Sequence, residues 1–171
     1  MKRHTLTTLR LLLALACSLI LTTNALAQGV STGRLPAPEC MGVDLDGSQT
    51  IRAYGSGTTK HDAIEQAQKN AVQAVIFKGI LDGQKGCDVR PILSEPNAAE
   101  SYEVFFNEFF GRRGGYREYI EVLDVQRFTD RQKARNERFT TYSVTVRVYR
   151  NELKQLLREA RILNDDALLH P

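Results

Sequence analysis

Two cysteines, Cys40 and Cys87, carry the chemistry that is simplest to assign in this chain. If the chain is exported, as its first residues indicate below, an isolated pair of cysteines favours a disulfide over two free thiols. The pair lacks the C-x-x-C spacing of a redox-active site. Closing a loop of this length stabilises a fold by about 4 kcal/mol if chain entropy dominates. We therefore predict a Cys40–Cys87 disulfide that ties an irregular N-terminal arm to the loop after the first long helix.

Side chains suited to catalysis or metal binding are few. After residue 27 the chain has two histidines, His61 on a polar helix face and His170 in the C-terminal tail. They do not allow a Ser-His-Asp or Cys-His group, or a histidine zinc site, to be assembled. Asp44-x-Asp46-Gly47 is similar to the start of a calcium loop, but its glycine comes two positions early and the twelfth position holds no glutamate. We predict no catalytic residue, no metal and no cofactor.

Acidic residues leave one enzymatic alternative open. Pairs of Asp and Glu are abundant, although the sequence places them on solvated faces. A carboxylate-dependent enzyme acting on envelope polymers is therefore the alternative to a non-enzymatic protein. A deep pocket that holds two carboxylates would favour the enzyme, whereas a flat surface with basic or apolar patches would favour a partner-binding protein.

Basic side chains gather in two places. One group surrounds an expected hairpin tip, which also holds Asp130 and Glu137, and comprises Arg127, Arg131, Lys133, Arg135 and Arg138. The second group surrounds a glycine turn and comprises Arg112, Arg113 and Arg117. Either group is suited to phosphates or carboxylates of an envelope polymer, lipid headgroups or an acidic partner. The alternative is a solvated tip whose charges discourage aggregation through the sheet edge. We predict that the five residues of the tip bind an anionic partner.

The first 27 residues have the pattern of a secretory signal peptide. Three basic residues precede or begin an apolar run over 11–21, and Ala25-Leu-Ala27 is a typical cleavage pattern. The run is too short for a spanning helix, which needs about 20 residues. We predict export, with the periplasm as the compartment and Gln28 as the first mature residue. A competing interpretation makes Cys17 a lipidation site, the one route to membrane association that we consider.

The composition of the mature chain excludes some classes of protein. The 23 Lys and Arg of the whole chain include three in residues 1–27, which hold no acidic residue, so 20 basic residues face 20 acidic ones in the mature chain. This neutral balance argues against nucleic-acid binding, which usually needs a basic excess. The length fits one domain. We predict a flexible leader over 28–40, a single α+β domain over 41–163 and a frayed tail over 164–171.

The N-terminal half of this domain should contain a hairpin and a helix. Asp46-Gly47 lies between alternating apolar residues, which indicates a hairpin. We expect the strand over 50–54 to end at Gly55-Ser-Gly57, and Thr59-x-x-Asp62 to begin a helix over 60–78. An alanine stripe on that helix predicts close packing on a sheet. Gly-Ser-Gly is also similar to part of a phosphate-binding turn, but it lacks the remaining glycine or lysine of the known fingerprints.

The C-terminal half should contain two more helices and a long hairpin. After a loop over 81–96, Asn97 should cap a helix over 98–110 whose aromatic stripe, Phe105, Phe106 and Phe109 included, faces the core. A strand over 116–128, with a bulge, should pair with the alternating strand over 141–148. Asn151 should cap a final helix over 151–163. Together these elements predict an antiparallel sheet of three to four strands with about three helices packed largely on one face.

The strand, Tyr54-Gly-Ser-Gly57 and the helix Asp62-Ala-Ile-x-x-Ala67-x-x-x-Ala71-Val72 suggest a family. This stretch, followed by an antiparallel pair, resembles the small exported modules of bacterial envelope lipoproteins. It is also similar to the N-terminal module of the flagellar assembly protein T, with the likeness concentrated in residues 50–80. The resemblance implies no enzymatic activity. The expected function is therefore a secreted envelope protein that binds or helps to assemble other envelope components, whether an envelope protein or an anionic component.

Overall fold

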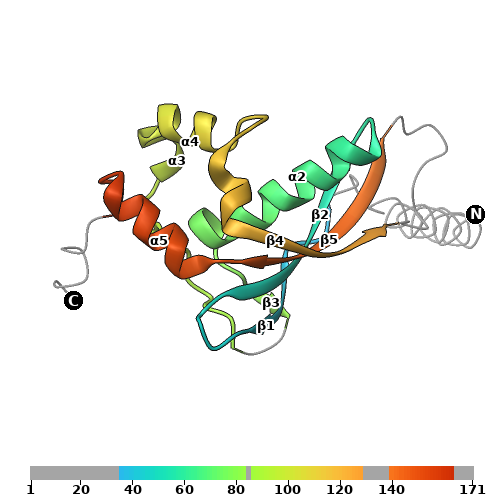
Figure 1. Ribbon diagram of the computed structural model, residues 1–171, viewed down its shortest axis with the longest axis horizontal. Helices are drawn as coiled ribbons and strands as arrows, with labels where there is room; N and C mark the ends of the chain where they lie inside the picture. Colours follow the sequence, from blue (N-terminus) through green and yellow to red (C-terminus); the bar gives the residue numbers. More distant parts are fainter. Residues whose placement is uncertain (1–34, 84–85, 129–138, 164–171) are drawn as a thin grey trace, which may run out of the picture. The chain divides into compact units, whose positions relative to one another are not determined.

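The computed structural model describes residues 35–83, 86–128 and 139–163. As predicted, the fold is α+β, with helices beside a five-stranded sheet in the order β3-β1-β2-β5-β4 (Figure 1). The predicted number of three to four antiparallel strands is wrong. It omits β3 (Asp82–Gly83), which pairs in parallel with β1 (Glu39–Val43). Two residues, neither with an apolar side chain, are too few to show the alternation from which a strand is predicted.

Several sequence predictions concern residues outside the described ranges. The signal peptide and Cys17 lie in 1–34, and the predicted tail lies in 164–171. The leader predicted over 28–40 differs from the structure at its end, because Glu39 and Cys40 belong to β1. Within the described residues, no helix has the length and apolar content needed to cross a membrane.

The predicted hairpin at Asp46-Gly47 is confirmed. β1 pairs antiparallel with β2 (Gln49–Gly57), and Gly47 adopts a positive φ of 82° in the turn between them. The Asp46 carboxylate accepts hydrogen bonds from the Ser48 hydroxyl, at 2.6 Å, and from the Ser48 backbone N–H, at 2.8 Å. These bonds lower the pKa of Asp46. The turn is thus determined by residues adjacent in sequence.

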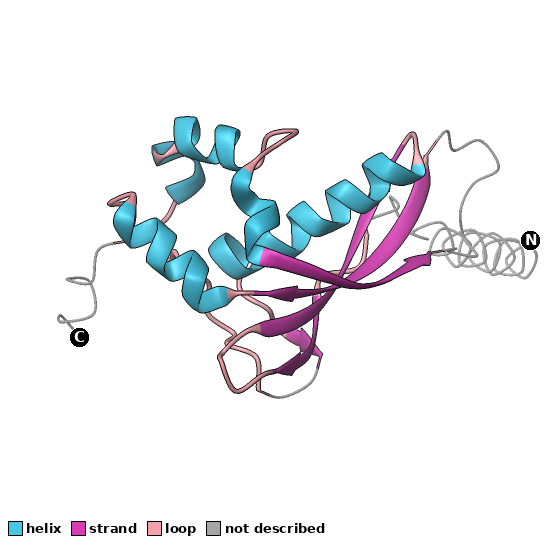
Figure 2. Ribbon diagram, viewed as in Figure 1, coloured by secondary structure: helices cyan, strands magenta, loops and turns pink. Residues whose placement is uncertain are grey.

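Gly55 and Gly57 lie inside β2 and not in the turn that we predicted for them. The reason is tertiary: a Cβ atom at Gly55 would overlap the Ala63 carbonyl oxygen and the Ala67 amide nitrogen. Both atoms belong to helix α2 (Lys60–Gln73), which lies across β2 and β5 (Thr140–Val148) (Figure 2). The two glycines therefore allow the alanine face of α2 to approach the strand closely, as the alanine stripe predicted.

Helix α2 begins as expected and ends differently. The Thr59 hydroxyl accepts the backbone N–H of Asp62 at 3.1 Å, which caps the first turn. The expected single helix over 60–78 instead finishes in a π-helical turn, η1 (Ala74–Lys78), before Gly79 at φ 76°. Backbone N–H groups of Ile92 and Leu93 satisfy carbonyls of η1 at 2.9 Å and 2.8 Å. The loop after the helix thus stabilises its irregular end.

The second predicted helix is divided into α3 (Ala98–Ser101) and α4 (Glu103–Phe109) at Tyr102. Asn97 does not cap it through its side chain, because its backbone is left-handed, with φ 60°. The predicted core role of the aromatic stripe is confirmed for Phe106 and Phe109, which are 5% and 6% exposed. Phe105 is partly buried. The Phe106 ring lies 4.7 Å from the Phe77 ring, so the stripe packs on the π-helical turn.

The C-terminal hairpin is confirmed with one change. β4 (Ile120–Arg127) pairs antiparallel with β5, and the expected bulge lies between Val122 and Asp124. Residues expected to begin this strand form the 3₁₀ helix η2 (Gly115–Tyr119) instead. The Tyr116 side chain in η2 is fully buried. Burial of this ring therefore overrides the strand preference of the local sequence.

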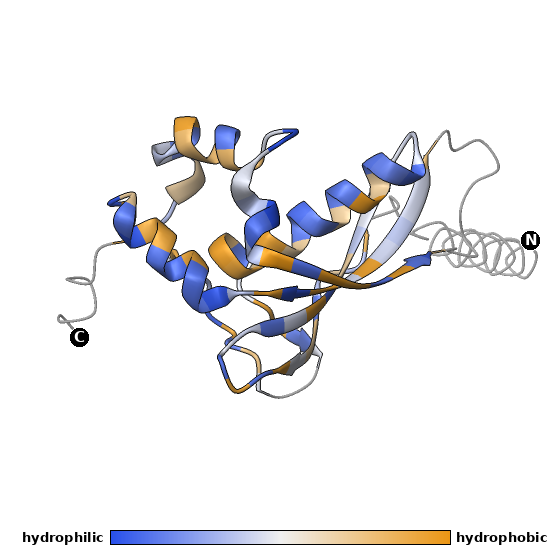
Figure 3. Cartoon of the chain, viewed as in Figure 1, coloured by the Kyte–Doolittle hydropathy of each residue, from blue (hydrophilic) through white to orange (hydrophobic). Residues whose placement is uncertain are grey.

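The last helix, α5 (Arg150–Glu159), is shorter than the predicted range. Asn151 does not cap it: its side-chain amide donates to the Asp46 carbonyl, at 2.8 Å, and joins the helix to the first hairpin turn. Leu153 and Leu157 are buried, and Figure 3 shows the alternation of apolar and polar residues along α5. Among the helices of the described residues, only α2 extends along the sheet, whereas α3, α4 and α5 gather at one end (Figure 2). The expectation of three helices packed on one face is thus corrected.

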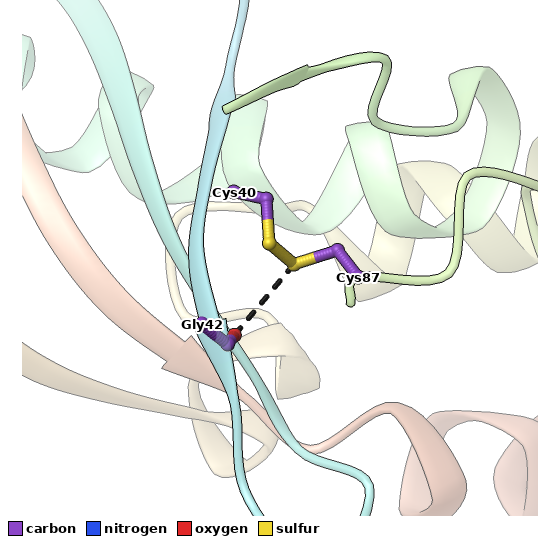
Figure 4. The surroundings of a disulfide bond; sticks show 3 residues. All are labelled: Cys40, Gly42 and Cys87. Carbon is purple, nitrogen blue, oxygen red and sulfur yellow. Dashed lines mark hydrogen bonds between the residues drawn. A yellow bond between two sulfur atoms is a disulfide. The ribbon is translucent and has the colours of Figure 1, made fainter. Parts of the chain in front are cut away.

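Cys40 and Cys87 meet as predicted. Their Cα atoms lie 6.0 Å apart and their sulfur atoms are at bonding distance (Figure 4). The Cys87 sulfur also lies 3.6 Å from the Gly42 carbonyl oxygen, a packing contact because a disulfide sulfur has no hydrogen to donate. The link joins β1 to the loop after η1.

Candidate functional site

Of the five basic residues predicted to bind an anionic partner, the structure describes one. Arg127 is exposed at the end of β4. The other four lie outside the described residues: Arg131, Lys133, Arg135 and Arg138. The role predicted for the hairpin tip therefore stays a prediction, and the described part of this region is the strand that leads to it.

The second basic group does not form one cluster of free cations. The Arg117 guanidinium lies over the Tyr116 ring at 4.9 Å, donates to the Arg112 carbonyl at 2.7 Å and pairs with Glu65 at 3.2 Å. Arg112 and Arg113 are exposed. Arg117 thus connects η2 to α2, while the other two arginines of the group are exposed to solvent.

Strand β4 forms an edge of the sheet, and among the described strands it pairs only with β5. Two hydrogen bonds show which backbone groups of β4 and its flanks face β5: the Phe128 N–H donates to the Thr141 carbonyl and the Tyr149 N–H to the Tyr119 carbonyl, each at 3.0 Å. Hydrogen-bonded and non-hydrogen-bonded pairs alternate in an antiparallel ladder. The β4 residues of the non-hydrogen-bonded pairs therefore direct their N–H and C=O groups away from β5, to the open edge. These residues are Ile120, Val125 and Arg127.

An apolar groove runs beside this edge, between β4 and α2. It has a volume of about 330 Å³. Ile64, Ile120 and Val122 supply its apolar lining, and its polar lining comprises His61, Glu65, Gln68 and Arg117. Val122 is 44% exposed and the neighbouring Leu123 is 45% exposed. A strand added to β4 would place every second side chain on this side of the sheet. We call this region, β4 with its groove, the edge site.

Glu65 organises the charged rim of the edge site. Its carboxylate lies 2.9 Å from the Lys69 ammonium and 3.2 Å from the Arg117 guanidinium, and its side chain is 15% exposed. Burial by itself raises the pKa of Glu65, but the hydrogen bond from Lys69 and the charges of Lys69 and Arg117 outweigh burial, so the pKa lies below its ordinary value. His61 Nδ1 lies 3.9 Å from the same carboxylate. The rim is therefore held in place by paired charges.

Sequence reasoning did not identify the edge site. The Glu65–Lys69 pair has the i, i+4 spacing of a helical ion pair and was visible in principle. The pairing of Glu65 with Arg117 joins residues far apart in sequence, and no local signal marks it. Among the described residues, no group of three or more His, Cys, Asp or Glu side chains is placed to hold a metal ion.

Comparisons with known proteins give no relative: no protein-family model, curated protein or solved structure matches this chain. The likeness to envelope lipoprotein modules and to the flagellar assembly protein T therefore stays a prediction. The edge site has to be interpreted from its own geometry.

Proposed function

We propose that the protein is an exported, non-enzymatic module that binds or helps to assemble other envelope components, with the periplasm as its compartment. The observation that carries the proposal is the edge site, where open backbone groups of β4 lie beside an apolar groove. The cysteine pair at bonding distance supports export, because disulfides persist in oxidising compartments.

The proposed partner is an extended segment of another envelope protein. A strand that joins a sheet edge gains affinity from main-chain hydrogen bonds and specificity from pockets that accept alternate side chains. Each main-chain bond contributes about 0.5–1.5 kcal/mol net. Ile64, Ile120 and Val122 would receive an apolar side chain, and the Glu65–Arg117 pair would border it.

The irregularity of β4 limits how such a partner pairs. The bulge between Val122 and Asp124 interrupts the ladder, so regular pairing is available on either side of it but not across it. Bulges and charged residues at sheet edges also oppose pairing between identical flat strands. This edge is therefore better suited to a short, selected segment than to indiscriminate self-association.

Selection of peptides tests the proposal. Random twelve-residue peptides displayed on phage are selected on the mature protein, and synthetic copies are titrated against the wild type and two variants, Val122→Lys and Leu123→Lys. We expect alternating apolar residues in the selected peptides, and at least a tenfold loss of affinity in each variant. Val104→Lys is the matched control, because Val104 is 85% exposed on α4 and lies outside the edge site.

Far-UV circular dichroism establishes that each variant keeps the fold. Selected peptides that bind both edge variants as tightly as the wild type would exclude the edge site as the binding surface. Failure to select any peptide above background would equally contradict strand addition at β4.

An enzyme acting on envelope polymers remains the second candidate function. One observation favours it: Glu108 and Glu118 line the same pocket, of about 370 Å³. Paired carboxylates are the usual groups of glycoside hydrolysis. The test is the release of soluble fragments from isolated peptidoglycan by the wild type and by Glu108→Gln and Glu118→Gln. Turnover that both substitutions abolish would establish the enzyme, and no release by the wild type would oppose it.

A further inference from the structure

A second hollow, distinct from the edge site, lies where α4, the turn before η2, and α5 meet. Its volume is about 370 Å³, within the range of pockets that hold small ligands or single side chains. Three aromatic and three charged side chains determine its chemistry, and we call it the aromatic pocket: Phe105, Phe109, Tyr119, Glu108, Glu118 and Arg113.

The aromatic wall is preformed. The rings of Phe105 and Phe109 lie 5.8 Å apart and are inclined by only 11°, and the Tyr119 ring lies 6.0 Å from the Phe109 ring. Phe109 is 6% exposed, so core packing holds the wall in position. The turn is equally constrained, because a Cβ atom at Gly114 would overlap the Phe109 carbonyl oxygen. A ligand would not have to order these groups when it binds.

The charges around the pocket favour a cation. Two carboxylates, those of Glu108 and Glu118, line it against the single guanidinium of Arg113. The pKa of the Tyr119 phenol is raised for a related reason. Burial is the largest cause, and the negative charges of the Glu118, Glu159 and Glu152 carboxylates raise the pKa further. Two of those glutamates, Glu152 and Glu159, belong to α5. Within the lining itself, negative charge thus exceeds positive charge, which favours a cationic ligand.

We propose that the aromatic pocket binds the guanidinium of an arginine side chain presented by a partner polypeptide. A guanidinium stacks on aromatic rings and donates paired, parallel hydrogen bonds to a carboxylate. Phe105 and Tyr119 offer the ring surfaces, and Glu108 and Glu118 offer the carboxylates. The positive charge of Arg113 repels the bound guanidinium and weakens its binding. The proposal is independent of strand addition at β4, since it rests on a different set of residues.

The test compares arginine with its neutral counterpart. N-acetyl-arginine amide and N-acetyl-citrulline amide are nearly the same shape, but only the first is charged, and each is titrated into the isotopically labelled mature protein while amide chemical shifts are followed. We expect saturable shifts in α4, η2 and α5 with the arginine derivative, weakened by added salt because charge attraction is screened. The citrulline derivative should produce at least fivefold weaker binding.

Three variants test whether the charged side chains of the pocket recognise the arginine derivative. Glu118→Gln should weaken arginine binding about two- to fivefold, as expected for one partly exposed ion pair. Arg113→Gln should strengthen it, because the opposing charge is removed. Glu103→Gln is the control: Glu103 is on α4, but it accepts a bond from Asn107 and does not line the pocket.

Glu118 and Arg113 are exposed, so both variants should fold as the wild type does. Equal binding of the citrulline derivative, or no response to Glu118→Gln and Arg113→Gln, would overturn the proposal. No saturable shift with the arginine derivative would overturn it as well.

Discussion

Replacement of Gly55 by alanine should be among the most destabilising single-methyl changes in this protein. Gly55 lies in β2 directly under α2, and an added Cβ would overlap the Ala63 carbonyl oxygen and the Ala67 amide nitrogen. Both obstacles are backbone atoms, so no side-chain rotation can remove the overlap. The whole helix would have to move away from the sheet.

The expected magnitude follows from two opposing effects. Gly→Ala at an unobstructed position stabilises by about 0.4–1 kcal/mol, because the unfolded chain loses freedom. Overpacking of a filled core costs about 1–3 kcal/mol, and backbone obstacles place Gly55→Ala at the upper end. We therefore expect a net loss near 2 kcal/mol or more, which for a chain of this size corresponds to a fall of about 4–8 °C in Tm.

Gly42 supplies the matched control. It also lies in a strand of the same sheet, β1, but no described atom comes within 4 Å of a Cβ built there, and its φ is not positive. Urea unfolding followed by far-UV circular dichroism gives the free energy of unfolding for both variants. Gly42→Ala should match or slightly exceed the wild type. A Gly55→Ala variant within 0.5 kcal/mol of Gly42→Ala would refute the close approach of α2 to β2, taking about 0.5 kcal/mol as the ordinary scatter of surface changes.

Four further predictions follow from other parts of the molecule. Non-reducing mass spectrometry of the mature protein should find Cys40 and Cys87 joined, and two alkylatable thiols in native protein would contradict this pairing. Phe106→Ala should lower the free energy of unfolding by about 3–5 kcal/mol, since the ring is 5% exposed, and unchanged urea unfolding would show the aromatic stripe to be peripheral. The pKa of Glu65 lies below its ordinary value of 4.5, so its stabilising effect is present above that pH and is lost as the pH falls through the folded-state pKa. The free energy of unfolding should therefore fall less steeply with decreasing pH in Glu65→Gln than in the wild type. Parallel curves for the two proteins would show that the Glu65 ion pairs do not contribute to acid unfolding. Replacing Arg131, Lys133 and Arg135 together with serine should change the free energy of unfolding by no more than about 0.5 kcal/mol. The same change should weaken the salt-sensitive association with anionic envelope fractions. Unchanged association at low salt would favour a solvated tip that binds no partner.

Elements of the fold that depend on neighbouring residues could be predicted from the sequence. The turn at Asp46-Gly47, the start of α2 at Thr59 and the alternation of β5 each depend on residues a few positions apart, through a turn conformation, a side-chain cap or a two-residue period. The α+β class and the pairing of β4 with β5 followed from such elements. The core role of Phe106 and Phe109 followed from helical spacing in the same way.

Tertiary contacts decided the remaining features. Gly55-Ser-Gly57 has the composition of a turn, yet the missing side chains of its two glycines allow helix α2 to pack closely on the strand. Asn97 and Asn151 have the residue type of a helix cap, but one adopts a left-handed backbone and the other donates to the Asp46 carbonyl. Each residue type has more than one use, and the neighbours that select the use come from elsewhere in the chain.

The edge site shows the same division most clearly. Its groove combines α2 with η2 and β4, which the loop over 81–96 and helices α3 and α4 separate in the sequence. The ion pair on its rim joins Glu65 to Arg117. The sequence by itself determined which segments could form helices and strands, because backbone preference and side-chain period are local properties. Only the tertiary structure decided which strand is left at the edge and which charges meet there, because those outcomes depend on how distant segments exclude or approach one another.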